Sequence, residues 1–193
     1  RTIRSAAFES MCPGNAPSDM LLDYHRSVAA GGIGMTTVAY AAVTQSGLSF
    51  DRQLWMRPEI IPGLRRLTDA IHAEGAAAGI QLGHCGNMSH KSICGCMPVG
   101  ASSGFNLYSP TFVRGLRADE LPEMARAYGR SVNLAREAGF DSVEIHAGHG
   151  YLISQFLSPS TNHRKDEFGG SLQNRMRFMD MVMEEVMKAA GSD

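Results

Sequence analysis

Residues 119–146, DELPEMARAYGRSVNLAREAGFDSVEIH, decide the fold. A helix-period segment, Asp119–Ala138, is followed by Gly139 and then by the apolar run 142–146. A glycine just past a helix supplies the left-handed residue that ends the helix. A short apolar run after such a stop is typical of a strand buried on both faces of a parallel sheet. These residues therefore predict one helix followed by one parallel strand, with Asp119 as the helix N-cap.

The same pattern occurs twice more in the chain. Helix-period segments at Ser18–Ala30 and Glu59–Glu74 end in glycine and lead into apolar runs at Ile33–Ala39 and Ala78–Leu82. An apolar opening, Ile3–Ala7, predicts the first strand. Ser171 is placed to cap a fourth helix, with Ser18 in the same role for the first. The predicted order is therefore βαβαβαβα.

Alternating strands and helices indicate a parallel sheet with helical crossovers. Four such units are half of a (β/α)8 TIM barrel. The rival is a small doubly wound sheet, but the first strand leads to residues 10–15, SMCPGN, which lack a dinucleotide-binding glycine fingerprint. The chain opens with Arg1 and closes just after a helix. We therefore expect residues 1–193 to be the N-terminal half of one α/β barrel domain whose C-terminal half is absent.

Composition excludes several classes of partner. Lys and Arg number 18 against 19 Asp and Glu, so no basic excess favours nucleic acid. No apolar run approaches the roughly 20 residues that span a bilayer, and we expect no signal peptide. The cysteines are expected to be reduced thiols in a cytoplasmic protein. The pair Cys94-Gly95-Cys96 is interpreted as loop thiols, because its spacing does not match ordinary zinc pairs.

Candidate chemistry concentrates at the carboxyl ends of the last two strands, where the long loops 83–118 and 147–170 begin. His146, His149 and Tyr151 place two imidazoles and a phenol within six positions. An imidazole can donate a hydrogen bond to an oxygen that becomes negative, and a phenol can donate a proton to a carbanion-like carbon. The amide of Gln81 suits the edge of a flat heterocycle.

A second enzyme class also stays open. His84, His146 and His149, with Glu9 or Glu144, offer ligands for a divalent metal in a barrel hydrolase. His25 and His72 lie on predicted helices and are expected to be solvated. The mixed charge run 164–167, RKDE, is expected to be a solvated loop.

Residues 146–178 carry a resemblance to a known family. The dense motifs at fixed spacing are HAGHGYLISQFLSP (146–159), NHRKDEFGGS (162–171) and NRMRF (174–178), and QLGHCG (81–86) adds a third-strand motif. Together they resemble the Old Yellow Enzyme family. That resemblance implies a (β/α)8 barrel, an FMN cofactor with NADH or NADPH as co-substrate, and reduction of the activated C=C bond of α,β-unsaturated carbonyl compounds.

The resemblance also implies roles for individual residues. His146 and His149 match the pair that binds the substrate's oxygen, and Tyr151 matches the proton donor. Gln81 matches the residue at the pyrimidine edge of the flavin. The other residues expected beside FMN are Ala6, Ala7, Phe8, Glu9, Tyr40 and His146 itself. No metal is implied.

Two features depart from the family's pattern. Glu9 stands where the family usually has Thr or Cys, and an ionised carboxylate there opposes a reduced anionic flavin unless it is protonated, turned away or displaced. The family takes its FMN phosphate site from the seventh and eighth strand loops, which this chain lacks. We therefore expect the chain alone to bind FMN poorly and to be inactive, or to be a non-catalytic barrel fragment. The half barrel has two unpaired sheet edges, and such edges can pair with another chain, so a homo-oligomer is possible.

Overall fold

A computed structural model describes residues 2–191. Its main sheet has four parallel strands in the order β1-β2-β3-β7. The strands are β1 (Ile3–Arg4), β2 (Met35–Ala42), β3 (Ala77–Gly83) and β7 (Ser142–Ile145). Sequential strands lie next to one another, joined by helical crossovers, as the sequence predicts.

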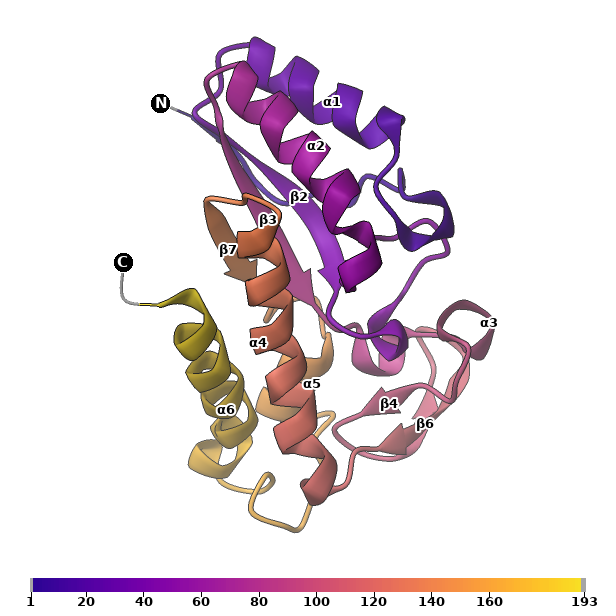
Figure 1. Ribbon diagram of the computed structural model, residues 1–193. Coiled ribbons are helices and arrows are strands. Elements are labelled where there is room, and N and C mark those ends of the chain that lie inside the picture. The colour runs from indigo at the N-terminus through magenta and orange to yellow at the C-terminus, as the bar shows by residue number, and fades with distance from the viewer. Residues whose placement is uncertain (1, 192–193) are drawn as a thin grey trace.

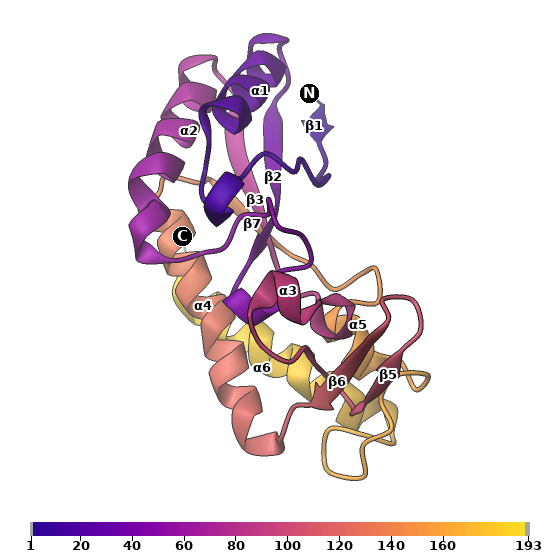
Figure 2. The same ribbon diagram turned by 90° about the vertical axis from the view of Figure 1, so that its right-hand side faces the viewer.

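Three of the longer helices, α1 (Asp19–Ala30), α2 (Ile61–Ala73) and α4 (Leu121–Glu137), lie along one side of this sheet (Figures 1 and 2). The last helix, α6 (Leu172–Ala190), packs against α4. Most buried residues of these helices and strands form one large hydrophobic core, and a second, smaller cluster contains Ala39, Tyr40 and Ala42 of β2. Among residues 2–191, no helix is both long and apolar enough to cross a membrane.

Helix starts follow the sequence signals in two of three cases. The hydroxyl oxygens of Ser18 and Ser171 accept hydrogen bonds from the amides three residues ahead, both at 3.2 Å. The prediction for Asp119 was wrong. A 3-10 turn, Ala118–Glu120, precedes α4, and Glu120 accepts the amide of Arg117 at 2.7 Å. The carboxylate of Asp119 is instead paired with the Arg117 guanidinium.

The loop 83–118 contains regular structure of its own. It holds α3 (Lys91–Cys94) and a three-stranded sheet in the order β4-β6-β5. The strands are β4 (Val99–Gly100), β5 (Gly104–Asn106) and β6 (Thr111–Gly115), and β5 and β6 pair antiparallel. This small sheet lies beyond the carboxyl ends of the main strands (Figure 2). It is joined there by α5 (Leu152–Leu157) from the next loop.

His25 contradicts the expectation of a solvated histidine. Its side chain is fully buried, its Nδ1 lies 2.8 Å from the hydroxyl of Thr36, and its Nε2 lies 3.2 Å from Glu9. The reason is helical period: Leu21, His25 and Ala29 recur every four residues on the buried face of α1. His72 on α2 is exposed, as predicted, and bonds to Asp141 at 2.8 Å.

Candidate active site

The residues predicted from the last two strands meet at one edge of the main sheet. β3 and β7 pair in register, with Gln81 opposite Glu144 and Leu82 opposite Ile145. The amide of His146 continues this ladder by donating to Leu82 at 2.9 Å. In parallel strands the carboxyl ends lie on the same side, so the loops after β2, β3 and β7 emerge together.

His146, His149 and Tyr151 form an aromatic cluster with Tyr40 of β2. The ring centroids of His146 and Tyr151 are 5.0 Å apart, and those of Tyr40 and Tyr151 are 5.3 Å apart. A side chain at Gly83 would reach this cluster, because a Cβ there would lie 3.1 Å from both His146 and Tyr40. Gly83 therefore allows β3 to pass beneath the two rings.

The two histidines are hydrogen bonded to each other. Nδ1 of His149 lies 3.1 Å from Nε2 of His146. Burial lowers the pKa of His146, and the neighbouring His149 lowers it further. With both rings neutral, their mutual bond uses one N–H, so one further N–H remains for a ligand. The turn that carries His149 is left-handed at that residue, with φ +56°.

Tyr151 is half-buried directly before α5, and no residue in the described range 2–191 hydrogen bonds to its hydroxyl. Tyr40 differs. Its hydroxyl donates to Gly47 at 3.1 Å and lies 2.9 Å from Ser49, and burial raises its pKa. Of the two phenols, only that of Tyr151 is therefore free to act as a proton donor.

Gln81 lies next to the aromatic cluster on β3. Its side-chain nitrogen donates to Glu144 at 2.5 Å, which fixes the orientation of the amide. Its side-chain oxygen accepts no hydrogen bond within residues 2–191. An oriented, unpaired acceptor fits the N–H edge of a flat heterocycle such as an isoalloxazine.

The first-strand segment 6–9 presents small and aromatic residues beyond β1. Ala7 and Phe8 are exposed, and Phe8 stacks on Phe50 with centroids 4.6 Å apart. The exposed pair of rings and the unpaired Gln81 oxygen are compatible with a planar group held against these strands.

The carboxylate of Glu9 is turned into the protein. It accepts the amide of Ala39 at 3.2 Å, where the register of β2 against β3 shifts between Val38 and Ala41. It also lies 3.2 Å from the guanidinium of Arg4, and its side chain is only 4% exposed. Glu9 therefore satisfies an amide at an irregularity of β2. A carboxylate at this position was expected to be protonated, turned away or displaced, and that of Glu9 is turned away.

Gln155 on α5 connects the two loops that surround the site, a role that the sequence interpretation missed. Its side-chain nitrogen donates to the carbonyls of Cys85 at 3.1 Å and Gly150 at 2.7 Å. Its side-chain oxygen accepts the amide of Asn87 at 3.2 Å. The available signal was a polar residue among Leu152, Ile153 and Phe156, in a helix too short to have a solvated face at that position.

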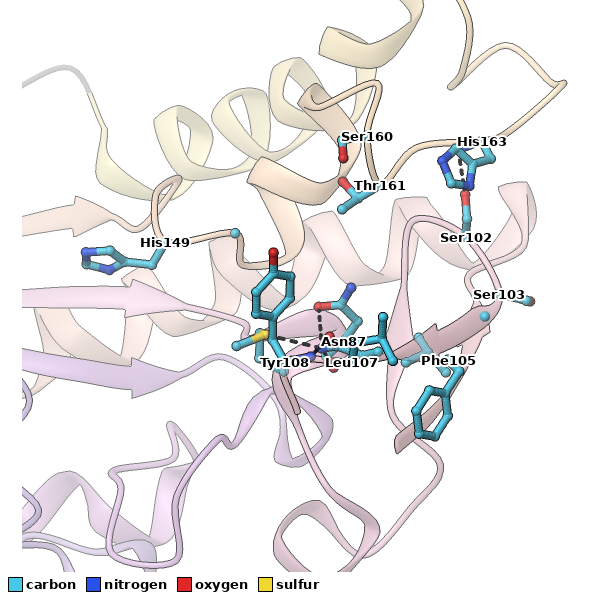
Figure 3. Close-up of a pocket in the computed structure, with 15 residues that line it drawn as sticks. Asn87, Ser102, Ser103, Phe105, Leu107, Tyr108, His149, Ser160, Thr161 and His163 are labelled. Atoms are coloured by element: carbon cyan, nitrogen blue, oxygen red, sulfur yellow. Dashed lines mark hydrogen bonds between the residues drawn. The ribbon is translucent and has the colours of Figure 1, made fainter. Parts of the chain in front are cut away.

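A cavity of about 550 Å³ opens beside His149 (Figure 3). Figure 3 shows its wall built from the β5–β6 hairpin, with Phe105 and Tyr108, and from the loop that carries His163. His149 is the one predicted catalytic residue that lines this cavity. The hairpin residues were not predicted, because nothing in the local pattern of a Gly- and Ser-rich loop indicates which strands it contacts.

The metal-site interpretation is not supported by the geometry. Both ring nitrogens of His84 are engaged, Nδ1 by the amide of Gly86 at 2.9 Å and Nε2 by Ser46 at 3.0 Å. Glu9 is paired with Arg4, as described above. Within residues 2–191, no group of three His, Cys, Asp or Glu side chains is placed to hold a metal ion.

The charge run after the site is not simply solvated either. The Arg164 side chain is 8% exposed and donates to the carbonyls of Ala101 and Leu116. Its guanidinium also pairs with Asp166. The prediction of a solvated loop was therefore wrong for Arg164, because the loop 157–171 uses this side chain to bind the β4–β6 region.

A parallel half barrel with oriented imidazole, phenol and amide groups at the carboxyl ends of its strands is the scaffold of a barrel enzyme. The chain belongs to the NADH:flavin oxidoreductase / NADH oxidase family, whose model matches residues 4–193. The barrel fold and the resemblance to Old Yellow Enzymes are thereby confirmed, and the doubly wound alternative is wrong.

Individual relatives agree with this family. The chain is 41% identical over 192 residues to 4,4'-dithiodibutanoate disulfide reductase of Rhodococcus erythropolis, covering 100% of this chain and 48% of the relative. It is 38% identical over 164 residues to NADPH dehydrogenase of Bacillus subtilis, covering 84% and 48%. The structure of the Old Yellow Enzyme homologue from Zymomonas mobilis matches with a TM-score of 0.92 at 29% identity, covering 99% and 56%. The chain thus spans about half the length of these relatives.

Proposed function

We propose that the protein containing this chain is an FMN-dependent oxidoreductase that uses NADH or NADPH to reduce the C=C bond of α,β-unsaturated carbonyl compounds. The observation that carries the proposal is the convergence of His146, His149 and Tyr151 at one strand edge, next to the oriented amide of Gln81. Membership in the NADH:flavin oxidoreductase family supports the cofactor and the electron donor.

This chain would contribute one side of the flavin site. Gln81 would bind the heterocycle edge through its unpaired oxygen, and Ala6, Ala7 and Phe8 would lie against the ring system. Tyr40 and His146 pack below the same region, and Glu9 holds the irregular part of β2 from behind. When bound, reduced FMN supplies the hydride; the protein supplies orientation and electrostatics.

The histidine pair would bind the carbonyl oxygen of the substrate. A neutral pair has one N–H left over from its mutual bond, on either His146 or His149. A donor that is already oriented stabilises negative charge on that oxygen without reorganising during the reaction. The lowered pKa of His146 keeps that ring neutral around pH 7.

Tyr151 would supply the proton that completes the reduction. Its ring is packed between Tyr40 and His146, while its hydroxyl has no partner within the described chain. A positioned phenol that spends no hydrogen bond on the protein can deliver its proton to the α-carbon of the substrate.

The experiment is a substrate comparison on the purified flavin-loaded protein. Cyclohexenone should be consumed with NADPH or NADH oxidation, and in D₂O deuterium should appear at the α-carbon, which receives the solvent-exchangeable proton. 4,4'-Dithiodibutanoate, the disulfide named for the relative from Rhodococcus erythropolis, serves as the competing substrate. Rapid reduction of that disulfide with no enone turnover would contradict the proposed ene reduction and indicate a disulfide reductase on the same flavin scaffold.

The 193-residue chain by itself remains predicted to bind FMN weakly and to be inactive. FMN titration followed by flavin fluorescence checks this directly, and micromolar affinity together with NADPH oxidation would contradict it. The cytoplasmic location stays a prediction that cell fractionation can test. The oligomeric state is likewise a prediction, which gel filtration can test.

A further inference from the structure

The thiols of Cys94 and Cys96 lie close together at the end of α3, in the loop 83–118. Their sulfur atoms are 3.7 Å apart, and the S–H of Cys94 also donates to the carbonyl of Cys96 at 3.2 Å. Gly95 between them is left-handed, with φ +75°, and ends α3. This turn brings both side chains to the same side of the loop.

We propose that Cys94 and Cys96 are a redox-active dithiol that small-molecule disulfides such as oxidised glutathione convert to an intraloop disulfide. A disulfide needs a sulfur–sulfur distance of about 2.0 Å, so the sulfurs must approach by about 1.7 Å. All four cysteines are free thiols, so the pair is available in its reduced form.

The two thiols differ in their exposure to solvent, so they take different steps in the exchange with an external disulfide. Cys96 is exposed and lines a cavity of about 470 Å³, whose wall also includes Met97 and Arg114. Cys94 is buried in a cluster with Leu48 and other apolar residues. Cys96 is therefore the thiol that an external disulfide can reach, and Cys94 is the one that resolves the product.

The reaction balances without any further reagent. The thiolate of Cys96 attacks one sulfur of oxidised glutathione and displaces the first glutathione as a thiolate, which takes up the proton. Cys94, as its thiolate, then attacks the Cys96 sulfur of the mixed disulfide and displaces the second glutathione. Two thiols of the protein lose two electrons in total, and one glutathione disulfide becomes two molecules of glutathione.

The setting of Cys96 makes the first step depend on pH. Partial desolvation and the neighbouring Cys94 raise the pKa of Cys96 to about 11, against the opposing effect of the Arg114 guanidinium. Only the thiolate attacks, so the rate of the first step should rise about tenfold per pH unit between pH 7 and pH 9.

Tryptic cleavage isolates this pair from the other cysteines. Cleavage after Lys91 and Arg114 gives a peptide, residues 92–114, that contains Cys94 and Cys96 alone, while Cys12 and Cys85 fall in separate peptides. Those two thiols are buried, and burial raises the pKa of each to about 12, so they serve as internal controls.

The test is incubation of the purified protein with oxidised glutathione, followed by alkylation, digestion and mass spectrometry. The peptide 92–114 should become about 2 Da lighter and resist alkylation until dithiothreitol is added. In Cys94→Ser, Cys96 should keep one glutathionyl group, because no resolving thiol remains. In Cys96→Ser, Cys94 should stay unmodified in the folded protein. A wild-type protein that keeps glutathione on Cys96, or whose two thiols both remain alkylatable, would overturn the proposal. The wild-type result decides the matter even if a variant fails to fold.

Discussion

Gly86 and Gln155 lie against each other where the loop after β3 meets α5. A Cβ on Gly86 would come within 2.5 Å of the side-chain nitrogen of Gln155, in the middle of the hydrogen bonds that this amide makes. Those bonds reach Cys85 on one loop and Gly150 on the other. The absence of a side chain at Gly86 therefore lets one amide join the third-strand loop to the turn that carries His149.

Gly86→Ala should destabilise the protein by clearly more than the backbone cost alone. Gly86 has φ +63°, so alanine pays roughly 1–2 kcal/mol for the left-handed conformation and must also displace Gln155. The matched control is Gly14→Ala, where φ is +65° but nothing lies within 4 Å of the added Cβ. Urea unfolding should give the larger loss for Gly86→Ala. Equal losses would mean that Gln155 moves aside without cost.

Tyr151→Phe should slow enone reduction at least about 100-fold while leaving reduction of the flavin by NADPH unchanged. The hydroxyl is the only part of the side chain removed, so packing of the ring against Tyr40 and His146 is kept. Stopped-flow measurement of the two half-reactions separates these effects. Tyr24→Phe, which removes a hydroxyl bonded to Arg4 on the helix side, serves as the control and should change neither half-reaction. Equal slowing of both half-reactions by Tyr151→Phe would assign the residue a packing role.

Glu9→Ala should reduce the free energy of unfolding by about 3 kcal/mol or more, because it removes the carboxylate that pairs with the buried charge of Arg4 and leaves the amide of Ala39 without its acceptor. Glu9→Gln keeps an acceptor for that amide and should cost less. Glu123→Ala is the control: its carboxylate pairs with arginines on the exposed face of α4, and such pairs contribute about 0–1 kcal/mol. If Glu9→Ala and Glu123→Ala cost the same, the buried ion pair does not stabilise β1 and β2.

The order of strands and helices was predictable from local signals, because each unit carries its own punctuation. A glycine follows each of the first three long helices and an apolar run follows that glycine, while a serine cap such as Ser18 marks the start of the first and last helices only. The chemistry at the end of β7 was predictable for a related reason: His146, His149 and Tyr151 are close in sequence, so a single turn brings them together.

Features that depend on contacts between distant segments were not predictable in this way. Nothing near Glu9 in the sequence indicates that its carboxylate meets the amide of Ala39, thirty residues later. The buried position of Arg164 depends on carbonyls of a loop about fifty residues earlier. His25 is a different case, because its four-residue spacing from Leu21 and Ala29 did indicate burial. That signal was outweighed by the usual preference of histidine for partly exposed positions.

His84 should make the protein progressively less stable as the pH falls below 6.5. Burial lowers the pKa of His84 from 6.5 to about 3, so the unfolded chain takes up a proton there while the folded protein does not. The loss begins as the pH drops through 6.5, continues to about pH 3 and then stops. Its slope is about 1.4 kcal/mol per pH unit for one proton. Urea unfolding of wild type and His84→Asn between pH 4 and pH 7 measures it, since asparagine can still accept the amide of Gly86 but cannot take up the proton. The free energy of unfolding of His84→Asn should change less steeply with pH, by the contribution of about one bound proton. If the free energies of unfolding of the two proteins change in parallel with pH, the buried imidazole takes up the proton in the folded state as well. The hydrogen bond from the amide of Gly86 to its Nδ1 would then be lost on acidification.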